Sequence, residues 1–186
     1  MNIKPLQYPQ QFQELLTPLS ILEIWTDGGV TNNGKENSFG GWSYVAIKPN
    51  EKPKIGYSEH VPGIVTNNRC EIMGVMAAIV EFANPECKLI VHSDSQYVVK
   101  TVNEWRHGWK RKNPALIKNK ELFEQLFDLV DKNHVELKWV KGHSTCVGNN
   151  IADFWATKAM HKQKPSDAHL EKADIIYYES VEGFSI

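Results

Sequence analysis

The sequence predicts one α/β (mixed α+β) domain, built on a mixed β-sheet with helices packed on its faces. Its first half contains three strand-like stretches joined by short turns, which is typical of an antiparallel meander. Its second half alternates strand patterns with helical patterns, which is typical of parallel crossover units. A length of 186 residues suits one domain with additional terminal segments, and such a chain can bury a core.

The strands are indicated by the spacing of apolar residues. In the first, alternate residues such as Ile21, Trp25 and Asp27 share one face. The glycine- and asparagine-rich stretch 27–38 predicts a loop after it. The short apolar run 88–93 is typical of a buried central strand. The expected strands span residues 20–27, 39–47, 54–61, 88–93 and 135–141.

The helices are indicated by capping residues and helix breakers. An N-cap among residues 66–68 begins the first helix, and Pro85 lies just beyond its end. Asp94 or Ser95 caps the second helix. The first expected helix ends near residue 83. The other expected helices span about 95–105, 119–131 and 150–161.

Bulk composition narrows the class of protein. The net charge of −1 means that any nucleic-acid binding must come from a local basic patch. Three irregularly spaced cysteines (Cys70, Cys87 and Cys146) indicate free thiols in a reducing compartment, so we expect a cytoplasmic protein without a signal peptide or membrane span. The expected organisation is an N-terminal extension (1–19), a catalytic domain (20–161) and a C-terminal tail (162–186), whose apolar end we expect to be covered.

Four acidic residues and one histidine carry the functional signal. Each has a local structural explanation. The first acid is a turn residue, the second lies in the first turn of a helix, the third caps a helix, and the fourth has capping-box spacing. Four carboxylates at one sheet edge, however, form a like-charge cluster that cations must neutralise, which favours a Mg²⁺ site for phosphate chemistry. The residues are Asp27, Glu71, Asp94, Asp153 and His143.

The contexts of these residues resemble the type 1 ribonuclease H family. The matching segments, in the family's order, are TDGG at 26–29, TNNRCEIMG at 66–74, SDSQYV at 93–98, WVKGH at 139–143 and NNIADFWA at 149–156. The resemblance covers about residues 20–161 and implies a ribonuclease H-like fold, with a five-stranded mixed sheet flanked by helices.

The resemblance implies an endonuclease that hydrolyses the RNA strand of RNA/DNA hybrids, leaving 5′-phosphate and 3′-hydroxyl ends. By similarity, Asp27 bridges two Mg²⁺ ions, for which Mn²⁺ is a possible substitute. Asp153 helps to hold the ion that activates the attacking water, while Glu71 and Asp94 hold the ion on the leaving-group side. His143 matches the histidine that assists proton movement or product release.

Substrate binding is implied at two places. Amide side chains suit 2′-hydroxyls and base edges in the minor groove, and a threonine suits a phosphate of the DNA strand, although these residues are also ordinary caps and turn formers. They are Asn33, Asn67 and Gln96, with Thr66 at the phosphate. The basic segment 105–120 resembles the family's basic protrusion, with Trp105, Trp109, Lys110, Arg111 and Lys112 as binding residues. It is shorter than the longest family form, since only four positions separate its two tryptophans.

Three other interpretations fit part of the sequence. A zinc site at His143 and Cys146 lacks a second pair of ligands at suitable spacing. A non-catalytic hybrid-binding module has the same fold, but all four acids are present. A resolvase- or integrase-like DNA nuclease uses a similar acidic site, against which the TNNR and SDSQYV segments argue. We expect a monomer, and the sequence leaves three alternatives open for the apolar end of the C-terminal tail, which are to add an edge strand, to pack on the core or to meet a protein partner.

Overall fold

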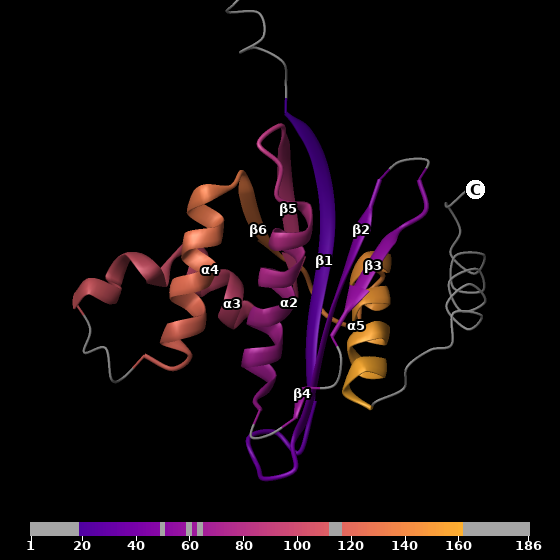
Figure 1. The fold of residues 1–186 in the computed structure, drawn as a ribbon, viewed down its shortest axis with the longest axis vertical. Helices are drawn as coiled ribbons and strands as arrows, with labels where there is room; N and C mark the ends of the chain where they lie inside the picture. Colours follow the sequence, from indigo (N-terminus) through magenta and orange to yellow (C-terminus); the bar gives the residue numbers. More distant parts are fainter. Residues whose placement is uncertain (1–18, 49–50, 59–60, 63–64, 112–116, 162–186) are drawn as a thin grey trace, which may run out of the picture.

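The computed structural model describes residues 19–48, 51–58, 61–62, 65–111 and 117–161 (Figure 1). Outside them lie the predicted tail 162–186, the predicted extension up to residue 18, and the candidate binding residue Lys112. Among the helices in the described part of the chain, none has the length and apolar character that a bilayer crossing requires.

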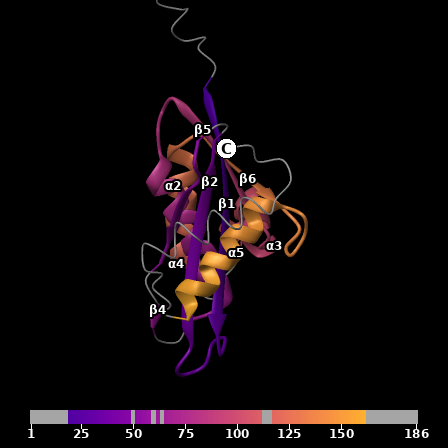
Figure 2. The same cartoon turned by 90° about the vertical axis from the view of Figure 1, so that its right-hand side faces the viewer.

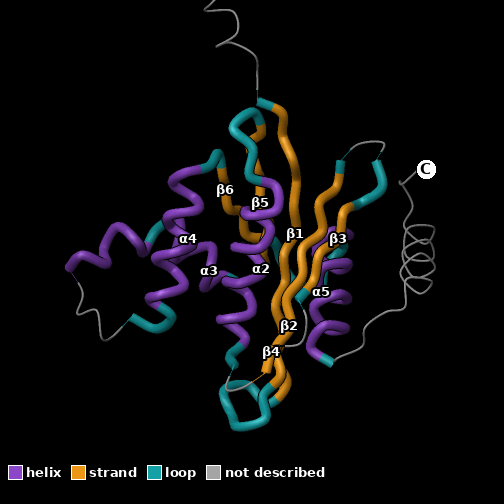
Figure 3. The backbone as a smooth tube through the Cα atoms, viewed as in Figure 1, coloured by secondary structure: helices purple, strands orange, loops and turns teal. Residues whose placement is uncertain are grey.

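The described strands form one mixed sheet (Figure 3). They are β1 (Ser20–Thr31), β2 (Phe39–Ile47), β3 (Lys54–Tyr57), β4 (Val61–Pro62), β5 (Cys87–Ser93) and β6 (Val135–Trp139). The main order is β3–β2–β1–β5–β6. Strand β2 pairs antiparallel with both β1 and β3, whereas β5 pairs parallel with both β1 and β6. The predicted five-stranded mixed sheet is thereby confirmed, with the two-residue β4 as an addition that pairs with the start of β2.

Helices cover both faces of this sheet. They are α2 (Asn67–Phe82), α3 (Gln96–Asn103), the 3₁₀ helix η2 (Trp105–Arg111), α4 (Lys120–Lys132) and α5 (Val147–Met160). In the described part of the chain, helices α2, α3 and α4 lie on one face, whereas α5 lies on the opposite face, over β1, β2 and β3 (Figures 1 and 2). The site described below lies where α2 and α5 approach β1 from opposite sides.

Two apolar clusters hold the layers together. The larger lies between the sheet and α2, α3 and α4, and it includes the fully buried Ile24, Ile72 and Phe123. The smaller lies between the sheet and α5, around Val45 and Trp155. Burying a side chain of this size stabilises a fold by about 1.5–3 kcal/mol. The helices are therefore fixed on the sheet mainly by their apolar faces.

Strand β1 is longer than predicted. Residues 27–31 were expected to begin a loop, and this was wrong, because they stay paired with β2 as far as Thr31 and Phe39. The parallel pairing with β5 ends earlier, at Thr26 and Ser93. Asp27 thus follows the last parallel pair even though it lies inside a strand.

Candidate metal centre

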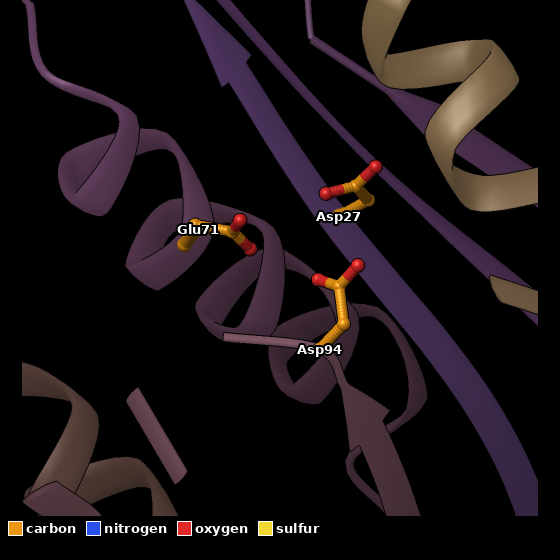
Figure 4. A group of neighbouring side chains, drawn as sticks. All are labelled: Asp27, Glu71 and Asp94. Carbon is orange, nitrogen blue, oxygen red and sulfur yellow. The ribbon is translucent and has the colours of Figure 1, made fainter. Parts of the chain in front are cut away.

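Three carboxylates converge at the end of the parallel ladder. Asp27 comes from β1, Glu71 from α2, and Asp94 from the residue directly after β5. One oxygen of each lies within 4.8 Å of the others. Figure 4 shows the three side chains pointing toward a common space between the strand and the helix.

The close approach of α2 to β1 depends on Gly28. A Cβ atom at this position would lie 2.3 Å from the backbone nitrogen of Glu71 and 2.4 Å from the carbonyl carbon of Cys70. The backbone N–H of Gly28 also donates a hydrogen bond of 2.7 Å to Oδ1 of Asp27. A glycine here therefore brings Glu71 against the strand and helps to orient the carboxylate of Asp27.

The helix boundaries remove the local explanations for three of the acids. Helix α2 begins at Asn67 and has no acid in its first turn, so Glu71 does not serve the helix terminus. Helix α5 begins at Val147, three residues earlier than expected, so Asp153 has no capping-box position. The cap of α3 is Ser95, whose hydroxyl accepts from the N–H of Val98.

Burial makes the cluster electrostatically costly. Asp27 is 7% exposed and Glu71 is 5% exposed. Burial, followed by the negative charge of Asp94, raises the pKa of Asp27 to about 8. Burial also raises the pKa of Glu71 well above its usual range, and the charges of Asp27 and Asp94 add to this. The fold thus disfavours the ionised form of these two carboxylates, and a nearby positive charge would favour it.

Asp153 approaches the cluster from α5, which is the opposite face of the sheet. It does not belong to the three-carboxylate group within 4.8 Å. It is nevertheless close enough for its charge to contribute to the raised pKa of Asp27. The fourth predicted acid therefore borders the centre on the Asp27 side.

The donor set fits a hard divalent cation. Oε2 of Glu71 is buried without a hydrogen-bond partner in the described part of the chain, whereas Oε1 accepts from Nδ2 of Asn67 at 3.4 Å. A buried carboxylate oxygen is stable when a donor or a cation satisfies it. Oxygen ligands at this spacing match what Mg²⁺ and Mn²⁺ prefer.

His143 lies on the loop between β6 and α5. Its side chain is exposed, and its backbone has a left-handed conformation with φ of 47°. Ser144 organises the loop, because its hydroxyl donates to the carbonyl of Lys141 at 2.7 Å and accepts from the N–H of Cys146 at 3.3 Å. The histidine is thus displayed at the surface of an ordered loop.

The predicted minor-groove residues lie around the start of α2 and α3. Asn33 is exposed, and its Oδ1 accepts from the backbone N–H of Asn67 at 3.1 Å. Asn67 in turn donates to Glu71, so it joins the loop after β1 to the carboxylate centre. Thr66 is the N-cap residue of α2 without a side-chain capping bond, and Gln96 is exposed at the first position of α3.

The first part of the basic segment, residues 105–111, forms η2, in which the two tryptophans differ. Trp105 is 43% exposed. Trp109 is half-buried, with edge-to-face contacts to Phe123 and Phe127. Lys110 and Arg111 belong to the end of this helix. The segment is therefore anchored on α4 by one tryptophan and presents the other to solvent.

Two residues near Asp94 were not predicted from the sequence. Nδ2 of Asn149, which is 1% exposed, donates to Oδ2 of Asp94 at 3.3 Å. Nε1 of Trp139 donates to the carbonyl oxygen of Asp94 at 3.1 Å. One available signal was the four-residue spacing between Asn149 and Asp153, which places both on one face of a helix.

Comparison with known proteins agrees with this fold. Residues 20–161 match the family model described as RNase H. Ribonuclease H of Chromobacterium violaceum is 40% identical over 147 residues, covering 75% of this chain and 94% of that relative. Ribonuclease H of Herminiimonas arsenicoxydans is 35% identical over 144 residues, covering 75% and 94%. The crystal structure of LC9-RNase H1 has a TM-score of 0.69 at 22% identity, covering 84% of this chain and 82% of that chain.

The fold and these relatives together define a nuclease, and three of the predicted acids form a carboxylate cluster in it. The chain belongs to the ribonuclease H family, as the sequence motifs predicted. Its relatives are named as ribonuclease H enzymes, so the prediction of an endoribonuclease is confirmed at the level of the enzyme class.

Proposed function

We propose that this protein hydrolyses the RNA strand of RNA/DNA hybrids internally, using two Mg²⁺ ions and leaving 5′-phosphate and 3′-hydroxyl ends. The observation that carries the proposal is the convergence of Asp27, Glu71 and Asp94 within 4.8 Å, with two of the three buried. Such a cluster suits cations bound to a phosphate, and it occurs here in a chain of the ribonuclease H family.

The four acids are assigned different roles according to their positions. Asp27 lies within 4.8 Å of Glu71 and Asp94 and close enough to Asp153 for the charge of Asp153 to affect it, so it would be a ligand of both cations. Glu71 and Asp94 hold the side of the leaving oxygen, and Asp153 holds the side of the attacking water. When bound, the two cations neutralise the scissile phosphate and stabilise the entering and leaving oxygens. Mn²⁺, with similar ligand preferences, is a candidate substitute.

His143 is proposed to move a proton or to help product release. Its imidazole is exposed on the loop that follows β6, and the preceding residue, Gly142, packs against the carboxylate of Asp94. A histidine changes its protonation state near neutral pH, which suits both roles. Replacing His143 with alanine should therefore lower kcat more than it raises KM.

The substrate is proposed to lie across the starts of α2 and α3 and against η2. Asn33, Asn67 and Gln96 supply amides for the minor groove, and Thr66 supplies a hydroxyl for a DNA phosphate. Trp105 and the cations of the basic segment are proposed to contact the DNA strand. One solved structure of similar fold, LC11-RNase H1, has been described in complex with RNA/DNA hybrid.

The domain organisation, location and oligomeric state are also proposals. The catalytic domain is proposed to span 20–161, with additional segments on both sides. A cytoplasmic location is proposed because Cys70, Cys87 and Cys146 are all free thiols, as in proteins of reducing compartments. The protein is also proposed to be a monomer.

Cleavage of labelled duplexes tests the proposed activity. RNA/DNA, RNA/RNA, DNA/DNA and single-stranded RNA would each be incubated with Mg²⁺, with EDTA, and with the Asp94→Asn variant. Cutting confined to the RNA strand of the hybrid, and abolished by EDTA and by the substitution, is the expected result. Binding of hybrid without cutting would indicate a non-catalytic module, and cutting of DNA would indicate a resolvase- or integrase-like nuclease.

A further inference from the structure

The segment from the end of β6 to the first turn of α5 holds Asp94 through three separate contacts. The indole N–H of Trp139 donates to the backbone carbonyl of Asp94 at 3.1 Å. Gly142 packs against the carboxylate, because a Cβ atom there would lie 2.4 Å from Oδ2. The amide of Asn149 donates to the same Oδ2 at 3.3 Å. Both the backbone and the carboxylate of Asp94 are therefore held by this one segment.

Asn149 itself is rigidly placed. It is 1% exposed, and its neighbour Gly148 packs so closely on Trp25 that a Cβ atom would lie 2.2 Å from the indole ring. Trp25 in turn stacks on His92, with ring centroids 4.9 Å apart. The first turn of α5 is thereby pinned on β1 and β5, next to Asp94.

The orientation of the amide is set by Asp94. A carboxylate only accepts hydrogen bonds, so the NH₂ group of Asn149 must face it. The amide oxygen, Oδ1, is left buried without a partner in the described part of the chain. A buried acceptor without a donor lowers the stability of the fold, so the contact between Asn149 and Asp94 is kept at the expense of stability.

We propose that Asn149 is a positioning residue that sets the rotation of the Asp94 carboxylate, holding Oδ2 on the protein and leaving Oδ1 for a divalent cation. Because Asn149 and Asp153 are four residues apart on α5, the same helix also places the fourth acid. The inference rests on the proposed function only in taking Asp94 as a cation ligand. Partners that orient metal ligands typically change metal affinity or activity by about 10–100-fold.

Mn²⁺ binding to the full-length protein tests this role without nucleic acid. Free Mn²⁺ would be measured by electron paramagnetic resonance during titration of the wild type, Asn149→Ala and Asn149→Leu. Leucine fills nearly the same volume as asparagine without a donor, so it is the deciding variant if the alanine variant does not fold. Asn150→Ala is the matched control, since its amide lies in the same turn but donates to the carbonyl of Ser144 at 2.9 Å.

The expected result is a Kd for Mn²⁺ about 10–100-fold higher in the Asn149 variants and unchanged in Asn150→Ala. Hybrid cleavage by the Asn149 variants should be partly restored by high Mg²⁺, with KM for the hybrid unchanged. An unchanged Kd accompanied by lower thermal stability would overturn the inference and leave only a structural role.

The two proposals fail in different ways. Weaker Mn²⁺ binding by the Asn149 variants supports the positioning role even if the duplex assay shows another substrate. Equal binding overturns it even if the protein cuts hybrids as expected. A wild-type protein that binds no Mn²⁺ would overturn the cation centre and the positioning role together.

Discussion

The carboxylate centre and the basic segment differ in how firmly the fold holds their side chains. Asp27 and Glu71 are almost fully buried, and one oxygen of Glu71 has no partner in the described structure. In η2, by contrast, Trp105 is 43% exposed while Trp109 contacts the aromatic rings of α4. The same short motif therefore contains one tryptophan that supports the fold and another that faces solvent.

This difference shows where a motif is informative about function. A buried carboxylate without a partner must either stay protonated or be neutralised by a cation, so packing alone does not explain it. A tryptophan beside cations has two sufficient explanations, packing and nucleic-acid stacking, and only the structure separates them. The predictions that follow test each side of this comparison, beginning with the largest effect.

Replacing Asp27 with asparagine should nearly abolish hybrid cleavage. The substitution keeps the shape of the side chain but removes the charge that contacts both cation positions. Since cations contribute several kcal/mol to such reactions, we expect a loss of about a thousandfold or more in kcat, measured in single-turnover cleavage. Glu23→Gln, which removes another acid of β1, is the control and should remain active. An Asp27→Asn protein with a tenth of the wild-type activity would contradict this role.

The metal-free protein should lose stability as pH rises. The pKa of Asp27 is raised from 3.8 to about 8, so the folded state binds this proton more tightly than the unfolded chain. Its contribution is complete below about pH 4 and is lost as pH approaches 8. Thermal unfolding in EDTA should show a falling Tm across this window, with a smaller slope for Asp27→Asn.

Mg²⁺ should counteract this loss, because a cation favours the ionised carboxylates. We therefore expect Mg²⁺ to raise Tm more at pH 8 than at pH 5, with a sodium salt of equal ionic strength as the control. A Tm that rises with pH in EDTA would show that the cluster is not the buried like-charge group described above.

Removing the cations of the basic segment should weaken substrate binding and leave chemistry intact. The triple substitution of Lys110, Arg111 and Lys112 with alanine should raise KM for the hybrid. It should also reduce the salt dependence of binding by about one unit of slope for each lost phosphate contact. A triple variant of Lys48, Lys52 and Lys54, at the β2–β3 hairpin, removes the same charge elsewhere. If both triple variants keep the wild-type KM at several salt concentrations, the segment is not a binding element.

Substitutions of the two tryptophans should affect different properties, which are stability for Trp109 and substrate binding for Trp105. Trp109→Ala should lower the free energy of unfolding by about 2 kcal/mol, roughly half of the cost of removing a fully buried aromatic side chain. Trp105→Ala should change stability by only about 0.5 kcal/mol, as surface substitutions usually do, and should raise KM instead. Chemical denaturation and cleavage kinetics of the two variants measure both effects. Equal losses of stability would remove the distinction between them.

Most of the fold was predictable because its strands and helices have clear periodicity and caps. The exception is instructive. Gly28 and Gly29 suggested a loop after Asp27, but both lie inside β1, opposite Trp42 and Gly41 of β2. Glycine at position 28 is required by the close approach of α2, which is a tertiary contact that local propensity does not encode.

The acids of the candidate metal centre were predictable from the sequence, but the residues that hold those acids in place were not. Asp27, Glu71 and Asp94 were identified from their contexts, and the structure brings them together. Asn149 and Trp139 stand in the same motifs, but their bonds to Asp94 join β6 and α5 to the end of β5. Such contacts depend on how these elements are placed in space, so sequence spacing gave only a partial signal.

Anomalous diffraction from crystals of the Asp153→Asn protein with RNA/DNA hybrid and Mn²⁺ tests the central claim most directly. The account predicts Mn²⁺ peaks at the scissile phosphate, bounded by Asp27, Glu71 and Asp94. In the wild type with an uncleavable hybrid it predicts two such peaks about 4 Å apart. Hybrid bound elsewhere on the protein, or bound here with no Mn²⁺ peak among these carboxylates, would contradict it.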